Sequence, residues 1–319
     1  MIEVKNLTKR YGNHLAVDHL NFTVESGKIY GFLGPNGAGK STTMNIMTGY
    51  LGATEGQVLI DGHDILKEPE EAKKNIGYLP EIPPLYMEMT VREYLEFAAE
   101  LKGIKKDKRE PQIEEVIRLA KLRAVENRLI QNLSKGYKQR VGLAQAVLGF
   151  PEIIILDEPT VGLDPKQIIE IRELIRKLAK KHTVILSSHI LAEVREVCDY
   201  IMIISGGKLV ASDTTENLEN MMSGKGQIEV EAKASRDEMD HIIRRTGKFK
   251  EVKYRTSASG ITTAQIIAKG GEDIREELFL AFSHADVPML TLNQSKTTLE
   301  EIFLELTQGS GNRMIKEEK

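Results

Sequence analysis

Gly34-Pro35-Asn36-Gly37-Ala38-Gly39-Lys40-Ser41 stands between an apolar run, KIYGFL, and a segment with a helical pattern, STTMNIMTGYL. Glycine tolerates the backbone angles of a tight loop, so the N–H groups of such a loop can point at phosphate oxygens. The N-terminus of the following helix adds the positive end of its dipole. Residues 34–42 are therefore predicted to form a phosphate-binding loop between a buried strand and a helix.

Two side chains complete the chemistry of this loop. Lys40 supplies a mobile cation for the β- and γ-phosphates of a nucleotide, and Ser41 supplies a hydroxyl for Mg²⁺. The pattern G-x-x-x-x-G-K-[ST] would occur by chance in about one chain in a hundred of this length, so an incidental glycine-rich turn is the weaker interpretation. The nucleotide-binding residues predicted in the loop are Gly34, Pro35, Asn36, Gly37, Ala38, Gly39, Lys40, Ser41 and Thr42.

A second apolar strand ends in two acids. Ile153-Ile154-Ile155-Leu156 is followed by Asp157 and Glu158. Ligands of open α/β sheets bind beyond the carboxyl ends of the strands, so Asp157 is predicted to hold Mg²⁺, directly or through water. Glu158 is suited to orient and deprotonate an attacking water. Such a strand end is often merely solvated, and the phosphate loop is what favours the catalytic interpretation.

Two ring side chains extend this candidate site. His189 follows the apolar strand TVILSS, where an imidazole could reach a γ-phosphate. Tyr11 precedes the phosphate loop on a strand-turn segment, and its ring could stack on adenine. Each would be read as a structural residue if it stood alone in the sequence. The neighbouring strand ends favour the functional interpretation of the histidine.

The segment Leu133-Ser134-Lys135-Gly136-Tyr137 opens a helix that runs through VGLAQAVLG. Small residues and a serine at a helix N-terminus form an anion site that needs no nearby lysine. With this segment, the chain resembles the ATP-binding subunits of ABC transporters, whose signature is usually LSGGQ. Gly136 retains the second glycine of that signature, whereas Lys135 and Tyr137 replace Gly and Gln.

The resemblance covers about residues 1–220 and includes six motifs in order. They are the aromatic Tyr11, the loop 34–42, the signature 133–137, the strand ending in Asp157-Glu158, the D-loop-like segment Gly162-Leu163-Asp164-Pro165, and the switch histidine His189. Glu81 stands where the family usually has the Q-loop glutamine. The strings LPE and LSKGY and the C-terminal extension ending TLEEIFLEL look most like those of ABC-2-type export ATPases.

The resemblance implies an ATPase that works as a dimer. Two such subunits sandwich two ATP molecules, so that the phosphate loop of one faces the signature residues Leu133, Ser134, Lys135, Gly136 and Tyr137 of the other. Asp164 would lie in the dimer D-loop. The implied cofactors are ATP and Mg²⁺, with Glu158 and His189 catalytic and with Ser41, Asp157 and Glu81 as metal ligands. One copy of each motif implies a second nucleotide-binding chain, expected to be a second copy of this one.

The same resemblance implies a separate membrane-spanning permease. No apolar run approaches the roughly 18–20 residues that cross a bilayer, so the chain is expected at the cytoplasmic face of the membrane, peripheral and bound through the permease. The alternative is a soluble ABC ATPase that acts on a ribosome or on DNA. The chain lacks the second cassette, the long coiled coils and the cysteines typical of such proteins, and its net charge of −3 favours no nucleic-acid partner.

Length and pattern predict the domains. A chain of 319 residues with 41% hydrophobic and 29% charged residues suits about two globular domains. Residues 1–220 are predicted as an α/β phosphate-loop ABC ATPase core, with a helical subdomain over about 87–149. A linker, 221–226, precedes a small α+β domain, 227–307, whose β-α-β-β-α-β order is ferredoxin-like and which is expected to be regulatory or dimerising. A flexible tail, 308–319, follows.

Two helices carry clear start signals. Thr90-Val91-Arg92-Glu93 is predicted to be a capping box that opens a helix. The residues expected on one face of that helix are Val91, Tyr94, Leu95, Ala98 and Leu101. Asp164 is predicted to cap a second helix, with Pro165 at its first position. The residues expected on the buried face of this second helix are Ile168, Ile171, Ile175 and Leu178.

Overall fold

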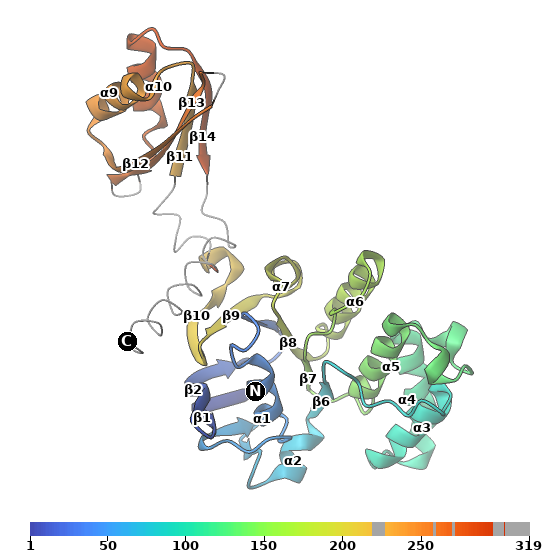
Figure 1. Cartoon of the computed structure of the whole chain (residues 1–319). Coiled ribbons are helices and arrows are strands. Elements are labelled where there is room, and N and C mark those ends of the chain that lie inside the picture. Colours follow the sequence, from blue (N-terminus) through green and yellow to red (C-terminus); the bar gives the residue numbers. More distant parts are fainter. Residues whose placement is uncertain (219–226, 258–259, 270–271, 296–302, 304–319) are drawn as a thin grey trace. The chain divides into compact units, whose positions relative to one another are not determined.

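The computed structural model describes residues 1–218, 227–257, 260–269, 272–295 and 303 (Figure 1). They group into two compact units, one within Met1–Thr215 and one within Glu216–Glu305. The expected linker, the expected tail and, apart from Phe303, the expected final helix at 298–306 lie outside the described residues. The domain boundaries therefore stay a prediction.

A six-stranded sheet forms the centre of the first unit, in the order β10-β9-β3-β8-β7-β6. The strands from β9 to β6 pair in parallel, and β10 pairs antiparallel with β9. Strands β3, β7 and β8 are buried along their whole length, as the continuous apolar runs predict for a sheet covered on both faces. The strands are β3 (Ile29–Leu33), β6 (Ile76–Leu79), β7 (Ile153–Leu156), β8 (Thr183–Ser188), β9 (Tyr200–Ser205) and β10 (Lys208–Thr214).

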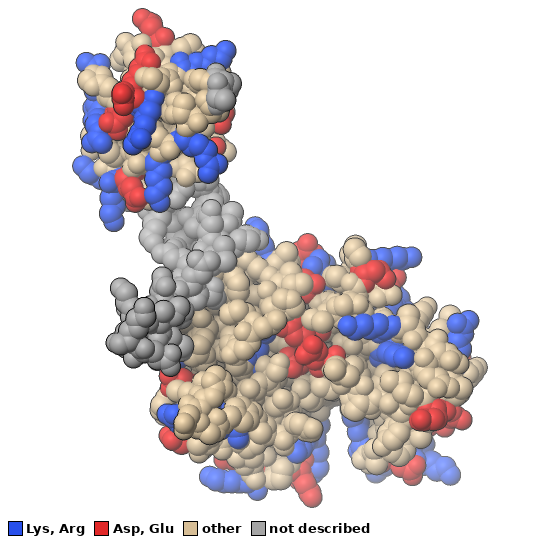
Figure 2. All heavy atoms as spheres, in the orientation of Figure 1, with Lys and Arg blue, Asp and Glu red and all other residues tan. Residues whose placement is uncertain are grey.

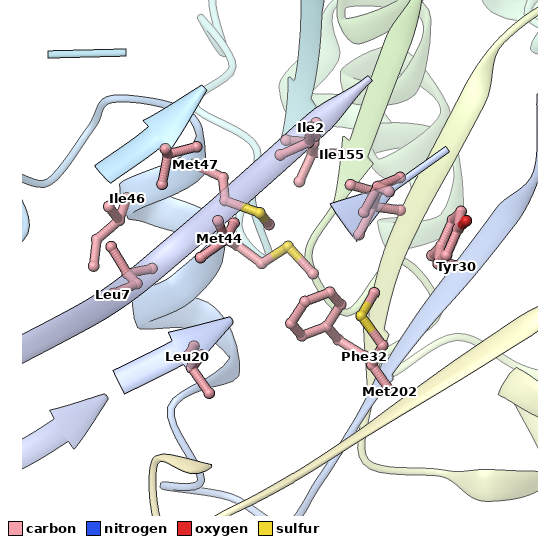
Figure 3. Close-up of a cluster of buried hydrophobic side chains, with 14 of the residues drawn as sticks. Ile2, Leu7, Leu20, Tyr30, Phe32, Met44, Ile46, Met47, Ile155 and Met202 are labelled. Carbon is pink, nitrogen blue, oxygen red and sulfur yellow. The ribbon is translucent and has the colours of Figure 1, made fainter. Parts of the chain in front are cut away.

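An antiparallel sheet of order β2-β1-β4-β5 belongs to the same unit. Its strands are β1 (Ile2–Tyr11), β2 (His14–Val24), β4 (Glu55–Ile60) and β5 (His63–Asp64), and the helix α1 (Lys40–Met47) shares their core. Figure 3 shows Met44 of α1 and Met202 of β9 beside Phe32 of β3, and all three side chains are buried. Full burial of each such side chain stabilises the fold by about 1.5–3 kcal/mol, so this cluster holds α1 and the phosphate loop in place.

The predicted helical block contains α3 (Val91–Leu101), α4 (Lys106–Leu119), α5 (Lys135–Val147) and the short helices η1 (Arg123–Val125) and η2 (Ile130–Asn132). The capping box predicted at the start of α3 is confirmed, because Thr90 Oγ1 accepts from Glu93 N–H at 3.2 Å and Glu93 Oε2 accepts from Thr90 N–H at 2.8 Å. Leu101 was expected on the buried face but is 72% exposed. It is the last residue of α3, where none of the described elements covers it.

Three further helices complete the first unit: α2 (Pro69–Lys74), α6 (Pro165–Leu178) and α7 (Leu191–Val197). Asp164 caps α6 by accepting from Gln167 N–H at 3.0 Å, with Pro165 in the first turn, as predicted. The buried face of α6 includes Leu174 in addition to the predicted residues, whereas Ile168 in the first turn is only half-buried. No helix within the described ranges is both long and apolar enough to span a bilayer.

The second unit has the predicted ferredoxin-like arrangement. Its elements follow the order β-α-β-β-α-β, and its antiparallel sheet has the strand order β12-β13-β11-β14. Val230, Ile266 and Tyr254 of the sheet pack with Ile243 and Phe282 of the two helices in a core separate from that of the first unit. The elements are β11 (Gln227–Ala232), α9 (Arg236–Thr246), β12 (Phe249–Thr256), β13 (Thr262–Ala268), α10 (Arg275–His284) and β14 (Met289–Ser295).

Close packing of β6 against α5 yields a test of this fold. A Cβ on Gly77 would lie 2.1 Å from the Ala146 carbonyl oxygen, so Gly77→Ala must displace backbone. We expect it to lower the free energy of unfolding of the first unit by about 1–3 kcal/mol, measured by urea denaturation. Gly52 is the control, because a Cβ there meets nothing within 4 Å, and Gly52→Ala should change stability by less than about 0.5 kcal/mol. Equal effects of the two changes would contradict this close packing of β6 on α5.

Candidate active site

The phosphate loop runs from the end of β3 to the start of α1. Gly39 caps α1 with a φ of 103°, and a Cβ there would lie 2.5 Å from the Ala16 carbonyl oxygen, so only glycine fits. Lys40 Nζ donates to the Gly34 carbonyl oxygen at 2.8 Å and to that of Pro35 at 3.3 Å. The loop therefore curls around the ammonium group of its own lysine, as a phosphate cradle requires.

The two acids after β7 lie beside this loop. Asp157 Oδ1 accepts from Ser41 Oγ at 3.3 Å and also from Ser187 Oγ of the neighbouring strand β8. The same Ser187 Oγ accepts from Glu158 N–H at 2.9 Å. One buried hydroxyl thus ties the ends of β7 and β8 together. Ser187 was not among the residues predicted from the sequence, although its place near the end of a predicted central strand was a usable signal.

Glu158 lies between two basic groups. Its Oε1 is 3.4 Å from Lys40 Nζ, and its Oε2 is 2.9 Å from His189 Nδ1. The side chain is buried, whereas the imidazole is 39% exposed. Glu158 has a φ of 46°, in the left-handed region that a glutamate rarely adopts. Such a conformation costs on the order of 1–3 kcal/mol and persists because the surrounding bonds hold it.

A cavity of about 370 Å³, the candidate nucleotide cavity, gathers most of the predicted site. Glu81, Glu158, His189 and Tyr11 all contribute to its wall, together with the phosphate loop. Gly34, Pro35, Ala38 and Asp157 are not part of the wall. The lining residues are Tyr11, His14, Ala16, Asn36, Gly37, Gly39, Lys40, Ser41, Thr42, Glu81, Glu158, Val161 and His189.

The lining includes residues that were not predicted, above all His14. This residue pairs with Tyr11 across the hairpin between β1 and β2. Gly12 and Asn13 form the turn, so a hairpin assignment from the sequence would have placed His14 beside Tyr11 at the cavity.

The signature segment lies away from this cavity, and none of residues 133–137 lines it. Ser134 caps α5 by accepting from Tyr137 N–H at 3.4 Å. The buried Gly136 faces the side chain of Gln167, which lies in the first turn of α6 after the D-loop. Within one chain, the signature and the D-loop are therefore neighbours, and the nucleotide cavity is a separate feature.

Two titratable groups near the sheet stay protonated. The hydroxyl of Tyr78 on β6 donates to Asn45 Oδ1 at 2.9 Å, and burial together with the charge of Asp157 raises the pKa of this tyrosine. Burial also raises the pKa of the Cys198 thiol well above its usual range. A protonated thiol is a poor nucleophile, and the buried Cys198 does not line the cavity described above.

A groove of about 840 Å³ adjoins the nucleotide cavity, and Glu81 and Ser41 line both. Tyr50 and Ile82 also line the groove, and each is 83% exposed. Exposed apolar side chains gathered at one groove are characteristic of interaction surfaces. Glu81 therefore lies at the junction of the nucleotide cavity and this surface.

Comparison with known proteins settles the family. A family model described as "ABC transporter" matches residues 17–161. Over 311 residues, the chain is 36% identical to the bacitracin transport ATP-binding protein BcrA of Bacillus licheniformis, a match that covers 97% of this chain and 98% of that protein. The chain belongs to the ATP-binding subunits of ABC transporters. The protein is an ATPase, and its hydrolysis of ATP is coupled to transport.

Other relatives agree with this placement. The linearmycin resistance ATP-binding protein LnrL of Bacillus subtilis is 31% identical over 308 residues, covering 96% of this chain and 98% of that protein. A solved ATP-binding subunit of an ABC transporter superposes with a TM-score of 0.64 at 32% identity, covering 69% of this chain and 92% of that structure. A dimeric post-hydrolysis cassette bound to ADP and phosphate gives 0.61 at 28% identity, covering 67% and 98%. The predicted ABC ATPase core is confirmed.

Proposed function

We propose that the chain powers an ABC-2-type exporter as a peripheral subunit on the cytoplasmic face of the membrane, held there by a separate permease. The observation that carries this proposal is similarity over the full length, C-terminal extension included, to a bacitracin transport subunit and a linearmycin resistance subunit. Co-purification with a membrane protein of about six spans, and stimulation of ATP hydrolysis by the exported compound, would test it. A soluble partner alone would contradict it.

A ribosome or DNA partner is the disfavoured alternative. The net charge is −3. On the face in Figure 2, basic and acidic side chains are interspersed on both units, without one continuous basic surface. Nucleic-acid binding relies on clustered Lys and Arg that replace counterions along the phosphates.

In the proposed reaction, Glu158 accepts a proton from the attacking water, and His189 orients the γ-phosphate end of the site. The 2.9 Å contact between Glu158 Oε2 and His189 Nδ1 supports a joint role. The oxygens of Ser41 and Asp157, 3.3 Å apart, are the hard donors that Mg²⁺ prefers, so they fit this ion. When bound, Mg²⁺ would neutralise charge on the β- and γ-phosphates.

The proposed active species is an ATP-dependent dimer in which Ser134 of one chain serves the nucleotide held by the other. The separation of residues 133–137 from the nucleotide cavity of the same chain supports this arrangement. Ser134 is exposed at the start of α5, a helix of 13 residues. The N–H groups in the first turn of this helix can therefore bind an anion that comes from outside the chain.

The second unit is proposed to stabilise this dimer through the open face of its sheet. β12 presents Lys253 and Arg255 on this face beside Glu251, whose Oε1 is 3.5 Å from Lys253 Nζ, and β11 presents Glu229 and Glu231. Pairing across β13 sets them in two rows, Lys253–Gln265–Glu229 and Arg255–Thr263–Glu231. With strands 4.7–4.9 Å apart, the basic and acidic columns lie about 10 Å from each other. A twofold axis parallel to the strands would place each basic column over the partner's acidic column.

The first test of the mechanism replaces Glu158 by glutamine, which keeps the size of the side chain and removes the base. We expect Glu158→Gln to retain ATP binding and to lose about 10²–10⁴-fold in turnover. Equilibrium binding of labelled ATP and release of phosphate are the two measurements. Turnover of Glu158→Gln at the wild-type rate would show that another group is the base, and His189 would be the first candidate.

A mixing experiment tests the signature in trans. Lys40→Ala removes the ammonium group proposed to contact the phosphates, and Ser134→Arg blocks the signature segment. Mixed in equal amounts, these two inactive variants form dimers with one intact composite site, so ATP hydrolysis should exceed that of either variant alone. Mixtures with Lys40→Ala/Ser134→Arg double-variant chains are the control, because they contain no intact site. Activity no higher than this control would count against the arrangement.

Glu81 is proposed as a metal ligand in place of the usual glutamine, supported by its position in the wall of the nucleotide cavity. Its carboxylate adds negative charge near the phosphates and Glu158, so ATP binding should depend more strongly on Mg²⁺. We expect Glu81→Gln to preserve hydrolysis and to lower the Mg²⁺ concentration needed for half-maximal ATP binding. An unchanged Mg²⁺ requirement together with altered stimulation by the permease would instead assign Glu81 to the adjoining groove and to coupling.

Charge reversal tests the second unit. Lys253→Glu/Arg255→Glu should weaken ATP-dependent dimerisation at low salt, measured by analytical ultracentrifugation, and Glu229→Lys/Glu231→Lys should do the same. An equal mixture of the two variants restores opposite charges in both columns and should restore the dimer. A chain ending at Met222 should keep ATP binding and dimerise more weakly. Unaltered dimerisation in all these variants would limit the second unit to another role.

A further inference from the structure

We propose that Glu193 is a positioning residue that holds Glu158 and His189 at a fixed separation. The proposal rests on the roles proposed above for Glu158 and His189. Glu193 lies on α7 and does not line the nucleotide cavity, so it acts through other residues.

The environment of Glu193 is unusual for a carboxylate. Its residue is 7% exposed. Thr160 Oγ1 donates to Glu193 Oε2, and Ser188 Oγ donates to the same oxygen at 3.3 Å. No lysine, arginine or histidine of the described ranges makes an ion pair with it. Burial of a charge without a counterion is costly, and hydrogen bonds from hydroxyls offset that cost only in a defined geometry.

Both hydroxyl donors come from the segments that carry the catalytic pair. Thr160 is two residues after Glu158, and Val161 N–H, next in the chain, donates to the Glu158 carbonyl oxygen at 3.2 Å. Ser188 directly precedes His189, and its hydroxyl also accepts from Ile190 N–H at 3.0 Å. Glu193 therefore joins the chain just after the proposed base to the chain just before the switch histidine.

These contacts close a ring. One link of the ring is the direct contact between Glu158 Oε2 and His189 Nδ1 at 2.9 Å. The other link, called the Glu193 bridge, runs from Thr160 through Glu193 to Ser188. Strand pairing fixes β7 and β8 only as far as their last residues, and Glu158 and His189 both lie beyond them. Ser187 of β8 already holds the backbone of Glu158, and the Glu193 bridge adds a further link between the chain after Glu158 and the residue before His189.

Loss of the Glu193 bridge should slow catalysis and leave ATP binding unchanged. Among the described residues, the phosphate loop (34–42) makes no hydrogen bond or ion pair with Glu193, and Lys40 keeps its bonds to the carbonyl oxygens of Gly34 and Pro35. A displacement of about 1 Å within a catalytic pair can cost up to about 100-fold in rate. A purely structural role would instead lower stability and change kcat and ATP affinity alike.

The experiment compares substitutions in the full-length chain. We expect Glu193→Ala to lower kcat about 10- to 100-fold, with the Kd for ATP changed less than about threefold. Glu193→Gln retains a carbonyl oxygen for both hydroxyls and should recover kcat to within about threefold of wild type. Glu196→Ala is the matched control, because Glu196 lies on the same helix and its carboxylate pairs with Arg172 at the surface. It should leave kcat unchanged.

A double substitution separates positioning from simple destabilisation. In a His189→Ala background the ring is already open, so adding Glu193→Ala should lower single-turnover hydrolysis by less than about threefold. Thr160→Val removes one hydroxyl at similar shape and serves if Glu193→Ala fails to fold. A full second loss in the double variant, or wild-type kcat in Glu193→Ala, would overturn the proposal. Wild-type turnover in Glu158→Gln would instead overturn the roles on which it rests.

Discussion

Main-chain pairing among β3, β8 and β7 sets the distances between the residues of the candidate active site. β8 lies between the other two strands, with Leu33 level with Ser188 and Leu156 level with Leu186. Because the strands are parallel, their carboxyl ends meet at one edge, and the phosphate loop, the two acids and His189 follow these strand ends. Ser187, on the middle strand, then joins Asp157 to the backbone of Glu158.

Local sequence was enough to predict where those residues of the candidate site lie whose positions depend on their neighbours in the chain. Gly39 and Lys40 follow a buried strand and open a helix, and Asp157 and Glu158 end another, so residue type and spacing carried the information. The ferredoxin-like order of the second unit was equally readable, because its strands alternate between apolar and polar residues. In both cases the informative residues lie within a few positions of one another in the chain.

The residues that sequence reasoning missed depend on strand pairing or on helix ends. Ser187 and His14 reach the site because their strands pair with particular neighbours, and the apolar pattern alone does not identify these neighbours. Leu101 and Ile168 were misjudged for another reason. Each continues the apolar period of a helix into its terminal turn, where the period persists but the covering element does not. Periodicity predicts which face is apolar, not how far the neighbouring element extends.

The contact between Gly136 and Gln167 explains which departures from the usual signature this chain can accept. A Cβ at position 136 would lie 2.4 Å from Gln167 Oε1, so a larger residue would push α5 away from the start of α6. Lys135 is exposed and Tyr137 is half-buried, so neither position faces that limit. The glycine retained from LSGGQ is thus constrained by the chain's own interior. The two replaced positions do not face Gln167, and the ammonium group of Lys135 instead lies against Gly162 of the D-loop-like segment.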